Sequence, residues 1–239
     1  MLKIAVIIPA AGTGQRLGYK IGKPYIKLNK KALLSYCLEV FDKSFEITDI
    51  FIAAEKTQLK RANNLVKKLK LSKLKAVICG GATRSESVFN VLKTLDKDTD
   101  YVLIHDAARP FVNKSLIAGC IKAVVKYKAV ICAVPCSATI KSVDKKMNVT
   151  ATLDRNSLWQ VQTPQAFSYK LIMEAYEKAG RKNLVFFDDA SLVEKIPHKI
   201  KVVLGFNNNI KITTKEDLDF ANAIINTRSQ NTDNRRQKK

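Results

Sequence analysis

Small residues and cations lie close together near the amino terminus, in a spacing that suits a polyphosphate. They are Ala10, Ala11, Gly12, Gly14, Arg16 and Lys23. Small residues let main-chain N–H groups approach an anion closely, because no large side chain blocks them. Arg and Lys beside such a loop could neutralise the charge that grows on phosphate oxygens during a reaction. The segment therefore predicts a site where a polyphosphate reacts, with a purely structural glycine-rich turn as the alternative.

The glycines of this segment also resemble the fingerprint of a dinucleotide-binding loop. That fold needs an acidic residue about 20 positions further on, after the second strand, to bind the ribose. The nearest acid beyond the second predicted strand is Glu55, more than 35 positions from the loop. The sequence therefore does not favour a dinucleotide site.

A second glycine-rich turn, Gly80-Gly81, precedes a predicted helix that carries Ser87. A base or a sugar could dock against the main chain of this turn, with Ser87 as a hydroxyl partner. Thr83 and Glu86, three residues apart, are equally well explained as an ordinary helix cap. The turn alone does not decide between these two interpretations.

A third segment, His105 to Pro110, places charged side chains at the end of a predicted buried strand. Asp106 could hold a divalent metal ion that is bound to phosphates, and Arg109 could bind a phosphate. A local Asp–Arg pair that closes the loop is the alternative. His105 is expected to be a hydrogen-bonded structural residue and not a base.

Further polar residues that could bind a substrate lie later in the chain. They are Thr139, Arg155, Thr163 and Lys211. Each of them alone could simply belong to the surface. Lys211 is harder to explain in that way, because it stands within a β-branched segment just before a predicted capped helix.

Strands and helices alternate around these residues. Strands are expected at 4–8, 49–54, 75–79, 101–104, 129–134 and 201–204, and helices at 32–41, 58–69, after 81, and at 115–125, 169–179 and 215–225. This alternation is typical of right-handed βαβ units. The predicted fold class is therefore α/β, with a Rossmann-like, mostly parallel sheet flanked by helices. Ligands gather at the carboxyl ends of the strands in such sheets.

The alternation breaks after Pro135. Residues 136–160 hold two β-branched stretches around a polar turn, which predicts a projecting β-hairpin arm. The arm has too few apolar residues to fold alone, so we expect it to pair with a second copy of the chain. The predicted domain covers residues 1–226 and includes the arm. Residues 227–239 are polar and basic and contain no apolar residue, which predicts a disordered tail.

The composition narrows the class of protein further. The formal net charge is +21, but 33 of the 42 basic residues are Lys and are spread over every segment. That pattern does not favour a nucleic-acid-binding groove, although the positive field would attract anionic substrates. The five cysteines have no CxxC spacing, which predicts reduced thiols, most of them in the core. No apolar run approaches the roughly 20 residues of a membrane span, and we expect no signal peptide and a cytoplasmic location.

Taken together and in order, these motifs resemble the 2-C-methyl-D-erythritol 4-phosphate cytidylyltransferase family of the non-mevalonate isoprenoid route. The resemblance covers about residues 4–225 and rests on AAGTGQR, GGATRSESV, HDAARP, TIK, DRNSLW, QTPQ, DDAS and NIKIT. It implies transfer of CMP from CTP to 2-C-methyl-D-erythritol 4-phosphate with release of diphosphate. It also implies Mg²⁺ as cofactor and a homodimer whose arms are swapped.

The resemblance implies a role for each site residue. Arg16 and Lys23 would stabilise charge at the α-phosphate, while Arg155 and Lys211 would hold the methylerythritol phosphate for attack. Asp106 would lie beside the metal ion. The residues that would frame cytosine and ribose are Ala10, Ala11, Gly81 and Ser87, and those that would line the acceptor phosphate are Thr139, Arg109 and Thr163. Thr139 and Arg155 would serve the partner's site.

No strong general base is needed for such a reaction, because the nucleophile is a phosphate that is already ionised near neutral pH. The scarcity of His in the motifs fits catalysis by positioning and electrostatics.

The chain departs from the family's pattern at three places, the least important of which is Ala82, in place of a residue that is often acidic. Pro24 follows Lys23, where the family usually has the Pro before the Lys. Phe187 stands where a Thr is common before Asp188, which could alter the acceptor pocket. The related ribitol-5-phosphate cytidylyltransferases are the nearest alternative. A binding module that has lost catalysis is an alternative of another class, and it would require the loss of charged site residues that are all present.

Overall fold

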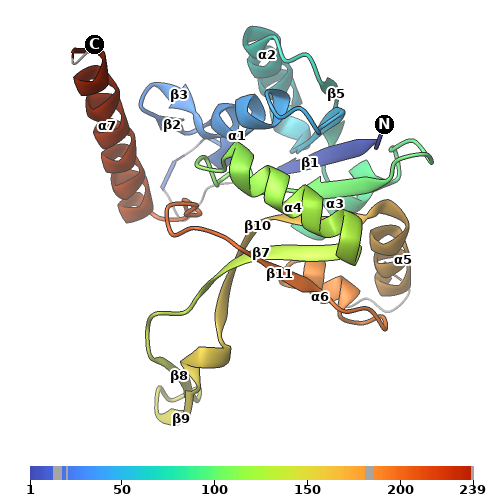
Figure 1. Ribbon diagram of the computed structural model, residues 1–239, viewed down its shortest axis with the longest axis vertical. Helices are drawn as coiled ribbons and strands as arrows, with labels where there is room; N and C mark the ends of the chain where they lie inside the picture. The colour runs from blue at the N-terminus through green and yellow to red at the C-terminus, as the bar shows by residue number, and fades with distance from the viewer. Residues whose placement is uncertain (13–17, 20, 181–185, 238–239) are drawn as a thin grey trace.

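A seven-stranded sheet organises the molecule, in the order β11-β7-β10-β6-β1-β4-β5 (Figure 1). The computed structural model describes residues 1–12, 18–19, 21–180 and 186–237. The strands of the sheet are β1 (Ile4–Ala10), β4 (Asp49–Ala54), β5 (Leu74–Cys79), β6 (Tyr101–Ile104), β7 (Ala129–Pro135), β10 (Trp159–Ser168) and β11 (Lys201–Leu204). Within this sheet β10 runs antiparallel to both of its neighbours, and the other pairs are parallel. The prediction of a mostly parallel α/β sheet is confirmed.

Helices cover both faces of the sheet, except for the last of them, which packs against Leu28 and Phe111 away from the sheet. They are α1 (Leu33–Asp42), α2 (Leu59–Leu69), α3 (Arg84–Leu92), α4 (Lys114–Tyr127), α5 (Tyr169–Gly180), α6 (Asp189–Val193) and α7 (Lys215–Gln237). In β1, Val6 and Ile8 pack into the core on the side of α1 and α4. Ala5 and Ile7 pack into a second core on the side of α3, α5 and α6. Burial on both faces explains why this strand is continuously apolar and does not alternate.

Strand β10 is the main element that the sequence does not predict. Half of its residues are polar, and it contains Pro164, which has no N–H to donate to a neighbouring strand. The pairing of β10 with β7 shifts in register between Gln162 and Gln165, so the proline is accommodated at an irregularity of the ladder.

Short elements also appear that were not predicted: β2 (Lys27–Leu28), β3 (Lys31–Ala32), α6 and the 3-10 turns η2 (Lys23–Tyr25), η3 (Lys56–Gln58) and η4 (Arg155–Ser157).

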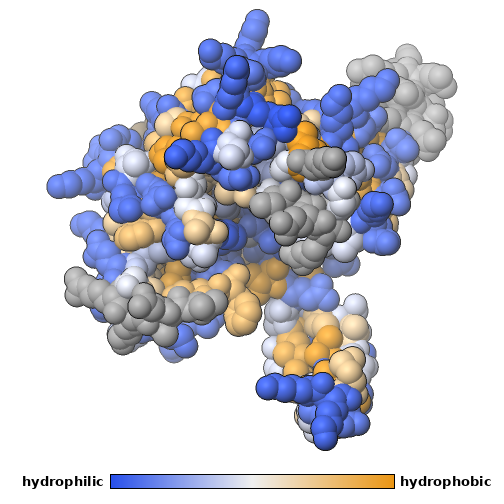
Figure 2. All heavy atoms as spheres, turned by 180° about the vertical axis from the view of Figure 1, so that it is seen from behind, coloured by the Kyte–Doolittle hydropathy of each residue, from blue (hydrophilic) through white to orange (hydrophobic). Residues whose placement is uncertain are grey.

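The predicted hairpin is present as β8 (Ile140–Val143) and β9 (Val149–Leu153), which form an antiparallel pair of their own. The pair projects from the body of the molecule (Figure 1). Its apolar side chains are open to solvent, since Val143 is 50% and Val149 61% exposed. Figure 2 shows apolar atoms gathered on the projecting arm. An exposed apolar surface of this kind is typical of an interaction site.

The carboxyl-terminal helix differs from the prediction. Helix α7 continues to Gln237, well past the predicted end at residue 225 and into the segment expected to be disordered from residue 227. No Gly or Pro occurs between residues 215 and 237, so no local signal ends the helix. The division into a domain and a tail remains a prediction.

Two expectations from composition concern the cysteines and the membrane. All five cysteines are free thiols, and only Cys79 is exposed. This confirms the prediction that the cysteines are reduced and that most of them lie in the core. No helix within the described ranges is both long and apolar enough to cross a membrane.

Candidate active site

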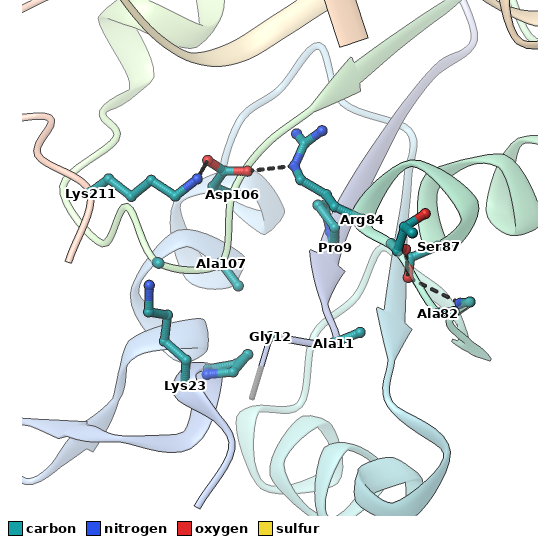
Figure 3. Close-up of a pocket in the computed structure, with 14 residues that line it drawn as sticks. Pro9, Ala11, Gly12, Lys23, Ala82, Arg84, Ser87, Asp106, Ala107 and Lys211 are labelled. Carbon is teal, nitrogen blue, oxygen red and sulfur yellow. Dashed lines mark hydrogen bonds and ion pairs between the residues drawn. The ribbon is translucent and has the colours of Figure 1, made fainter. Parts of the chain in front are cut away.

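A pocket of about 360 Å³ lies where β1, β5 and β6 end at their carboxyl sides (Figure 3). It brings together the three segments that the sequence singled out. Its lining consists of small residues around a few charged ones: Pro9, Ala11, Gly12, Lys23, Pro24, Gly81, Ala82, Thr83, Arg84, Ser87, Asp106, Ala107, Ala108 and Lys211. The small residues leave main-chain atoms accessible, as expected for a site that binds phosphates or a nucleoside.

The first wall of the pocket is the segment after β1. Ala10 is buried at the end of the strand, and Ala11 and Gly12 line the pocket. The backbone N–H of Lys23 donates to the carbonyl of Gly12 at 3.0 Å, which holds the start of η2 beside this loop. The Lys23 side chain points toward the pocket (Figure 3). Pro24 after Lys23 is therefore compatible with a Lys in the pocket, while the predicted site residues Gly14 and Arg16 lie outside the described residues.

The second wall is the turn from β5 into α3. Thr83 caps α3 by accepting a hydrogen bond from the Glu86 N–H at 3.1 Å, and the Glu86 carboxylate accepts one from the Ala82 N–H at 2.7 Å. The Ser87 hydroxyl accepts from the Gly81 N–H at 3.0 Å and donates to the Thr83 carbonyl at 2.8 Å. A Cβ on Gly81 would stand 2.4 Å from Cβ of Glu86, so the close wrapping of this turn requires glycine. The cap interpretation is confirmed, and contact of Gly81 and Ser87 with a nucleoside remains a prediction.

Asp106, which follows β6, lies at the centre of the charged groups. Its Oδ1 is 3.0 Å from Nε of Arg84, and its Oδ2 is 2.8 Å from Nζ of Lys211 and 3.9 Å from Nε of Arg109. Burial alone would raise the pKa of the Asp106 carboxyl, but the charges of Arg84, Lys211 and Arg109 outweigh burial and hold the pKa well below its usual range. Asp106 is therefore ionised at any pH at which the protein would work.

Lys211 reaches the pocket because the segment before α7 is tied to the sheet. The Ile212 N–H donates to the Ala108 carbonyl at 2.9 Å. The buried Asn209 donates from Nδ2 to the Thr163 carbonyl at 2.9 Å and to Gln162 at 3.2 Å. Asn209 is a supporting residue that the sequence did not single out by itself, and its place in the motif around Lys211 was the available signal.

Arg109 and Thr163 do not line this pocket in the structure. The Arg109 guanidinium donates to the carbonyls of Asn209, at 2.7 Å, and Val161, at 3.2 Å. The Thr163 hydroxyl accepts from the Asp106 N–H at 3.1 Å. Both side chains thus support the residues around Asp106 and Lys211, and their predicted contact with an acceptor phosphate remains a prediction.

His105 is a structural residue, as predicted. It is fully buried, its Nε2 lies 3.1 Å from the Arg109 carbonyl, and its Nδ1 lies 3.0 Å from the Thr163 hydroxyl. A carbonyl only accepts, so Nε2 carries the proton, and the Thr163 hydroxyl donates to Nδ1. Burial lowers the pKa of His105 to about 4, which keeps the imidazole neutral.

The depressed pKa of His105 predicts a pH dependence of folding stability. The pKa of a His side chain is 6.5 in the unfolded chain, whereas that of His105 in the folded protein is about 4. The stability that the neutral imidazole contributes is therefore fully present above about pH 6.5 and is lost as the pH falls toward 4. The loss is up to about 3 kcal/mol in the free energy of unfolding. Urea unfolding between about pH 7 and about pH 4.5 measures it. His105→Gln should flatten the dependence over this window, and an equal slope in the variant would contradict the assignment.

Two predicted site residues lie on the arm, away from the pocket of their own chain. Thr139 precedes β8 and is exposed. Arg155 begins η4 at the base of the arm, and the polar contact that its guanidinium makes is with the carbonyl of Ser137 at 3.4 Å. Neither residue lines the pocket. One chain by itself therefore does not bring these two residues to Lys23, Asp106 and Lys211.

The structure adds Arg84 and Asp189, which the sequence did not assign to the site. Arg84 lines the pocket and joins Asp106 to Asp189, whose Oδ2 is 2.8 Å from its Nη1. Both residues stood inside quoted motifs, but only the fold brings them together. Phe187 does not line the pocket: it is 99% exposed and borders an adjacent hollow beside Phe89 and Tyr176, which shares Thr83 and Arg84 with the pocket.

The donor set fits a metal ion that arrives with phosphates better than one held by protein alone. Among the described residues no group of three or more His, Cys, Asp or Glu side chains could hold a metal ion. Asp106 is the single carboxylate in the pocket lining. Mg²⁺ is usually bound by one or two carboxylates together with substrate phosphates and water, and Asp106 meets that requirement once Lys211 releases its Oδ2.

The pocket can therefore bind a polyanion and stabilise additional negative charge on it. Lys23, Lys211 and Arg84 supply positive charge, and the capped turn before α3 supplies exposed main chain. The buried imidazole is engaged on both nitrogens and cannot act as a base at this pocket. The arrangement is that of a site which works by electrostatics and positioning.

Comparison with known proteins gives consistent results. Residues 4–227 match the family model for 2-C-methyl-D-erythritol 4-phosphate cytidylyltransferase. The chain is 42% identical over 227 residues to the enzyme of that name from Alkaliphilus metalliredigens, with 95% of this chain and 94% of that protein covered. It is 41% identical over 235 residues to the one from Clostridioides difficile, with 98% of each covered.

Solved structures agree with these sequence similarities. The crystal structure of 4-diphosphocytidyl-2C-methyl-D-erythritol synthase from Anaerococcus prevotii superposes with a TM-score of 0.84 at 36% identity and covers 94% of this chain and 96% of that one. A 2-C-methyl-D-erythritol 4-phosphate cytidylyltransferase from Thermus thermophilus superposes with a TM-score of 0.76 at 27% identity, covering 93% and 98%.

Proposed function

Because the chain belongs to the 2-C-methyl-D-erythritol 4-phosphate cytidylyltransferase family, we propose that the pocket around Asp106 is where it transfers the cytidylyl group. The protein is a nucleotidyltransferase of the non-mevalonate isoprenoid route. It transfers CMP from CTP to 2-C-methyl-D-erythritol 4-phosphate and releases diphosphate. We choose this pocket because Lys23, Asp106 and Lys211 all line it at the carboxyl ends of the strands.

In the proposed mechanism the acceptor phosphate attacks the α-phosphorus of CTP, a P–O bond forms there, and the bond to the leaving diphosphate breaks. Negative charge grows on the α-phosphate oxygens as the displacement proceeds. Lys23, whose ammonium points toward the same space as Asp106 and Lys211 (Figure 3), stabilises that charge. Arg16, proposed from the sequence as its companion, lies outside the described residues. Most of the rate enhancement comes from charge and orientation that are in place before the reaction.

We assign two further roles within the pocket. Lys211 holds the acceptor phosphate, for which it must leave Oδ2 of Asp106, where it stands at 2.8 Å. Asp106 would then be the residue that holds the Mg²⁺ of the nucleotide. When bound, that ion neutralises phosphate charge and helps diphosphate to leave. The capped turn at Gly81 and Ser87, with Ala10 and Ala11, frames the cytidine.

The arm completes the acceptor site of a second chain in this proposal. Thr139 and Arg155 lie away from the pocket of their own chain, and the arm exposes apolar side chains such as Val143 and Val149. A homodimer with exchanged arms explains both observations, because it covers the apolar surface and supplies an Arg for the acceptor phosphate. We propose that the reaction takes place in this dimer and in the cytoplasm.

Exchange of arms predicts complementation between two inactive variants. Lys23→Ala removes a residue of the pocket, whereas Arg155→Ala removes one from the arm, so a mixed dimer has one pocket with both residues intact and one with neither. We expect co-expressed, doubly tagged mixed dimers to regain up to about half of the wild-type activity, measured as diphosphate release. Each parental homodimer is the control for background turnover. Mixed dimers no more active than the parents would show that Arg155 serves its own chain.

Diphosphate release with CTP and Mg²⁺ tests the function itself. We expect release with 2-C-methyl-D-erythritol 4-phosphate and not with ribitol 5-phosphate. Release with ribitol 5-phosphate alone would contradict the acceptor while leaving the pocket and its chemistry in place. Release with neither acceptor would contradict the function.

A further inference from the structure

One guanidinium joins two carboxylates that belong to different parts of the fold. Arg84 is the first residue of α3. Its Nε is 3.0 Å from Oδ1 of Asp106, which follows β6, and its Nη1 is 2.8 Å from Oδ2 of Asp189, the first residue of α6. Figure 3 shows the Arg84 side chain reaching Asp106 from the side opposite to Lys211. A single side chain therefore connects the pocket to an element outside it.

Asp189 is a fixed anchor for this contact. It is fully buried and does not line the pocket. Its Oδ1 accepts a hydrogen bond from the Tyr176 hydroxyl at 2.7 Å, and its Oδ2 faces Arg84. A buried carboxylate is stable only when it is paired and hydrogen-bonded, so Asp189 depends on both Arg84 and Tyr176.

The element that carries Asp189 is itself held in place. Asp188 and Ser191 form a reciprocal capping box at the start of α6. The Ala190 N–H donates to Oε1 of Gln165 at 3.0 Å, and Nε2 of Gln165 donates to Asp188 at 2.6 Å. Because Gln165 belongs to β10, these bonds attach α6 to the centre of the sheet. The position of Arg84 is thus determined by groups that lie outside the pocket lining.

On the pocket side, the two oxygens of Asp106 have different partners. Oδ1 contacts Arg84, which is permanently charged and held on a planar, rigid group. Oδ2 contacts Lys211, whose side chain is 41% exposed and flexible. One oxygen is therefore committed to a fixed cation, and the other faces a cation that can leave.

We propose that Arg84 is a positioning residue: anchored on Asp189, it orients the Asp106 carboxylate so that Oδ2 is the oxygen that exchanges Lys211 for the metal ion of the nucleotide. The proposal rests on the proposed function, because it assumes that a metal–nucleotide complex binds at Asp106. It extends that function to residues behind the pocket. Asp189 acts on the metal only through Arg84.

Asp189→Asn tests the proposal without altering the pocket lining. Asparagine has the same shape and can still accept a hydrogen bond from Tyr176, but it lacks the charge that holds Arg84. We expect at least a tenfold weaker binding of Mn²⁺ in the presence of CTP, measured by electron paramagnetic resonance without acceptor. The Mg²⁺ concentration for half-maximal turnover should rise by a similar factor, with a much smaller change in kcat at saturating Mg²⁺.

Tyr176→Phe is the matched control. It removes the hydrogen bond to the other oxygen of Asp189 but leaves both ion pairs of Arg84. It should lower the Tm and leave the metal dependence within twofold of wild type. If Asp189→Asn also lowers only the Tm, Asp189 is merely structural and the proposal is overturned.

Arg84→Lys keeps the test decisive if Asp189→Asn does not fold. A single ammonium cannot span both carboxylates as the guanidinium does, so the same loss of Mn²⁺ binding is expected, and wild-type Mn²⁺ binding would refute the proposal. The Mn²⁺ measurement needs no turnover. A wild-type protein that binds Mn²⁺ and CTP but releases no diphosphate would therefore contradict the proposed function. The role of Arg84 would still be tested by comparing Mn²⁺ binding between the wild type and the variants.

Discussion

Replacing Lys23 with glutamine is expected to lower the turnover of CTP by about 100- to 1,000-fold, which corresponds to about 3–4 kcal/mol of transition-state stabilisation. The Lys23 side chain lines the pocket, and its backbone is tied to Gly12, so the ammonium is in place before charge develops. Glutamine keeps much of the side chain's length and loses the charge. The KM for CTP should change less than kcat, because the Lys23 ammonium acts mainly on charge that develops in the transition state. Steady-state diphosphate release at saturating substrates measures the effect.

Lys27→Gln is the matched control for this prediction. Lys27 lies four residues further on, in β2, and is exposed, so its removal changes the net charge equally without touching the pocket. It should leave kcat within about twofold of wild type. Equal turnover of the two variants would show that Lys23 acts only through the general positive field of the protein.

Replacing Asp106 with asparagine is expected to abolish Mg²⁺-dependent turnover and to lower the free energy of unfolding by about 3–5 kcal/mol. The carboxylate is nearly buried and faces Arg84, Lys211 and Arg109. Without it, these cations lie close together with less opposing charge. CTP should consequently bind the variant without metal at least as tightly as it binds the wild type. Calorimetric titration with and without Mg²⁺, together with urea unfolding, measures both effects.

Asp49→Asn separates the catalytic from the structural part of this effect. Asp49 opens β4 at the amino ends of the parallel strands, its side chain is as little exposed as that of Asp106, and it pairs with Lys75 at 3.2 Å. Its replacement should lower stability and leave the Mg²⁺ dependence unchanged. A variant of Asp106 that kept metal-dependent turnover would contradict the assignment of Asp106 to the metal–nucleotide complex.

Elements with a strong apolar pattern were the ones that the sequence could predict. The strands β4, β6 and β11 have the predicted bounds, because each is a short apolar run between polar turns. Strand β10 was missed because half of its residues are polar and it is interrupted by Pro164. Its place in the sheet is decided by pairing with β7 and β6, which are distant in the sequence. Pairing of this kind leaves no local signal.

The same distinction holds for the site. The motifs predicted that Lys23, Asp106 and Lys211 belong to one pocket, and the structure places all three in its lining. The link from Arg84 to Asp189 could not be predicted, because it depends on where α3 and α6 meet behind the pocket. The sequence also could not tell that the Ser87 hydroxyl is fully buried and engaged by its own turn. Both features are products of packing and not of residue spacing.

Strand β10 belongs both to the base of the arm and to the centre of the sheet. At Trp159 and Gln160 it pairs with the last residues of β7, where the arm begins. From Gln165 to Ser168 it pairs with β6, the strand that leads to Asp106. The arm is therefore joined to the core by two hydrogen-bonded strands and not by a flexible tether. In the proposed dimer, the effective concentration of Arg155 at the pocket of the second chain would then depend on the stiffness and direction of these two strands, whereas for a tether it would depend on linker length.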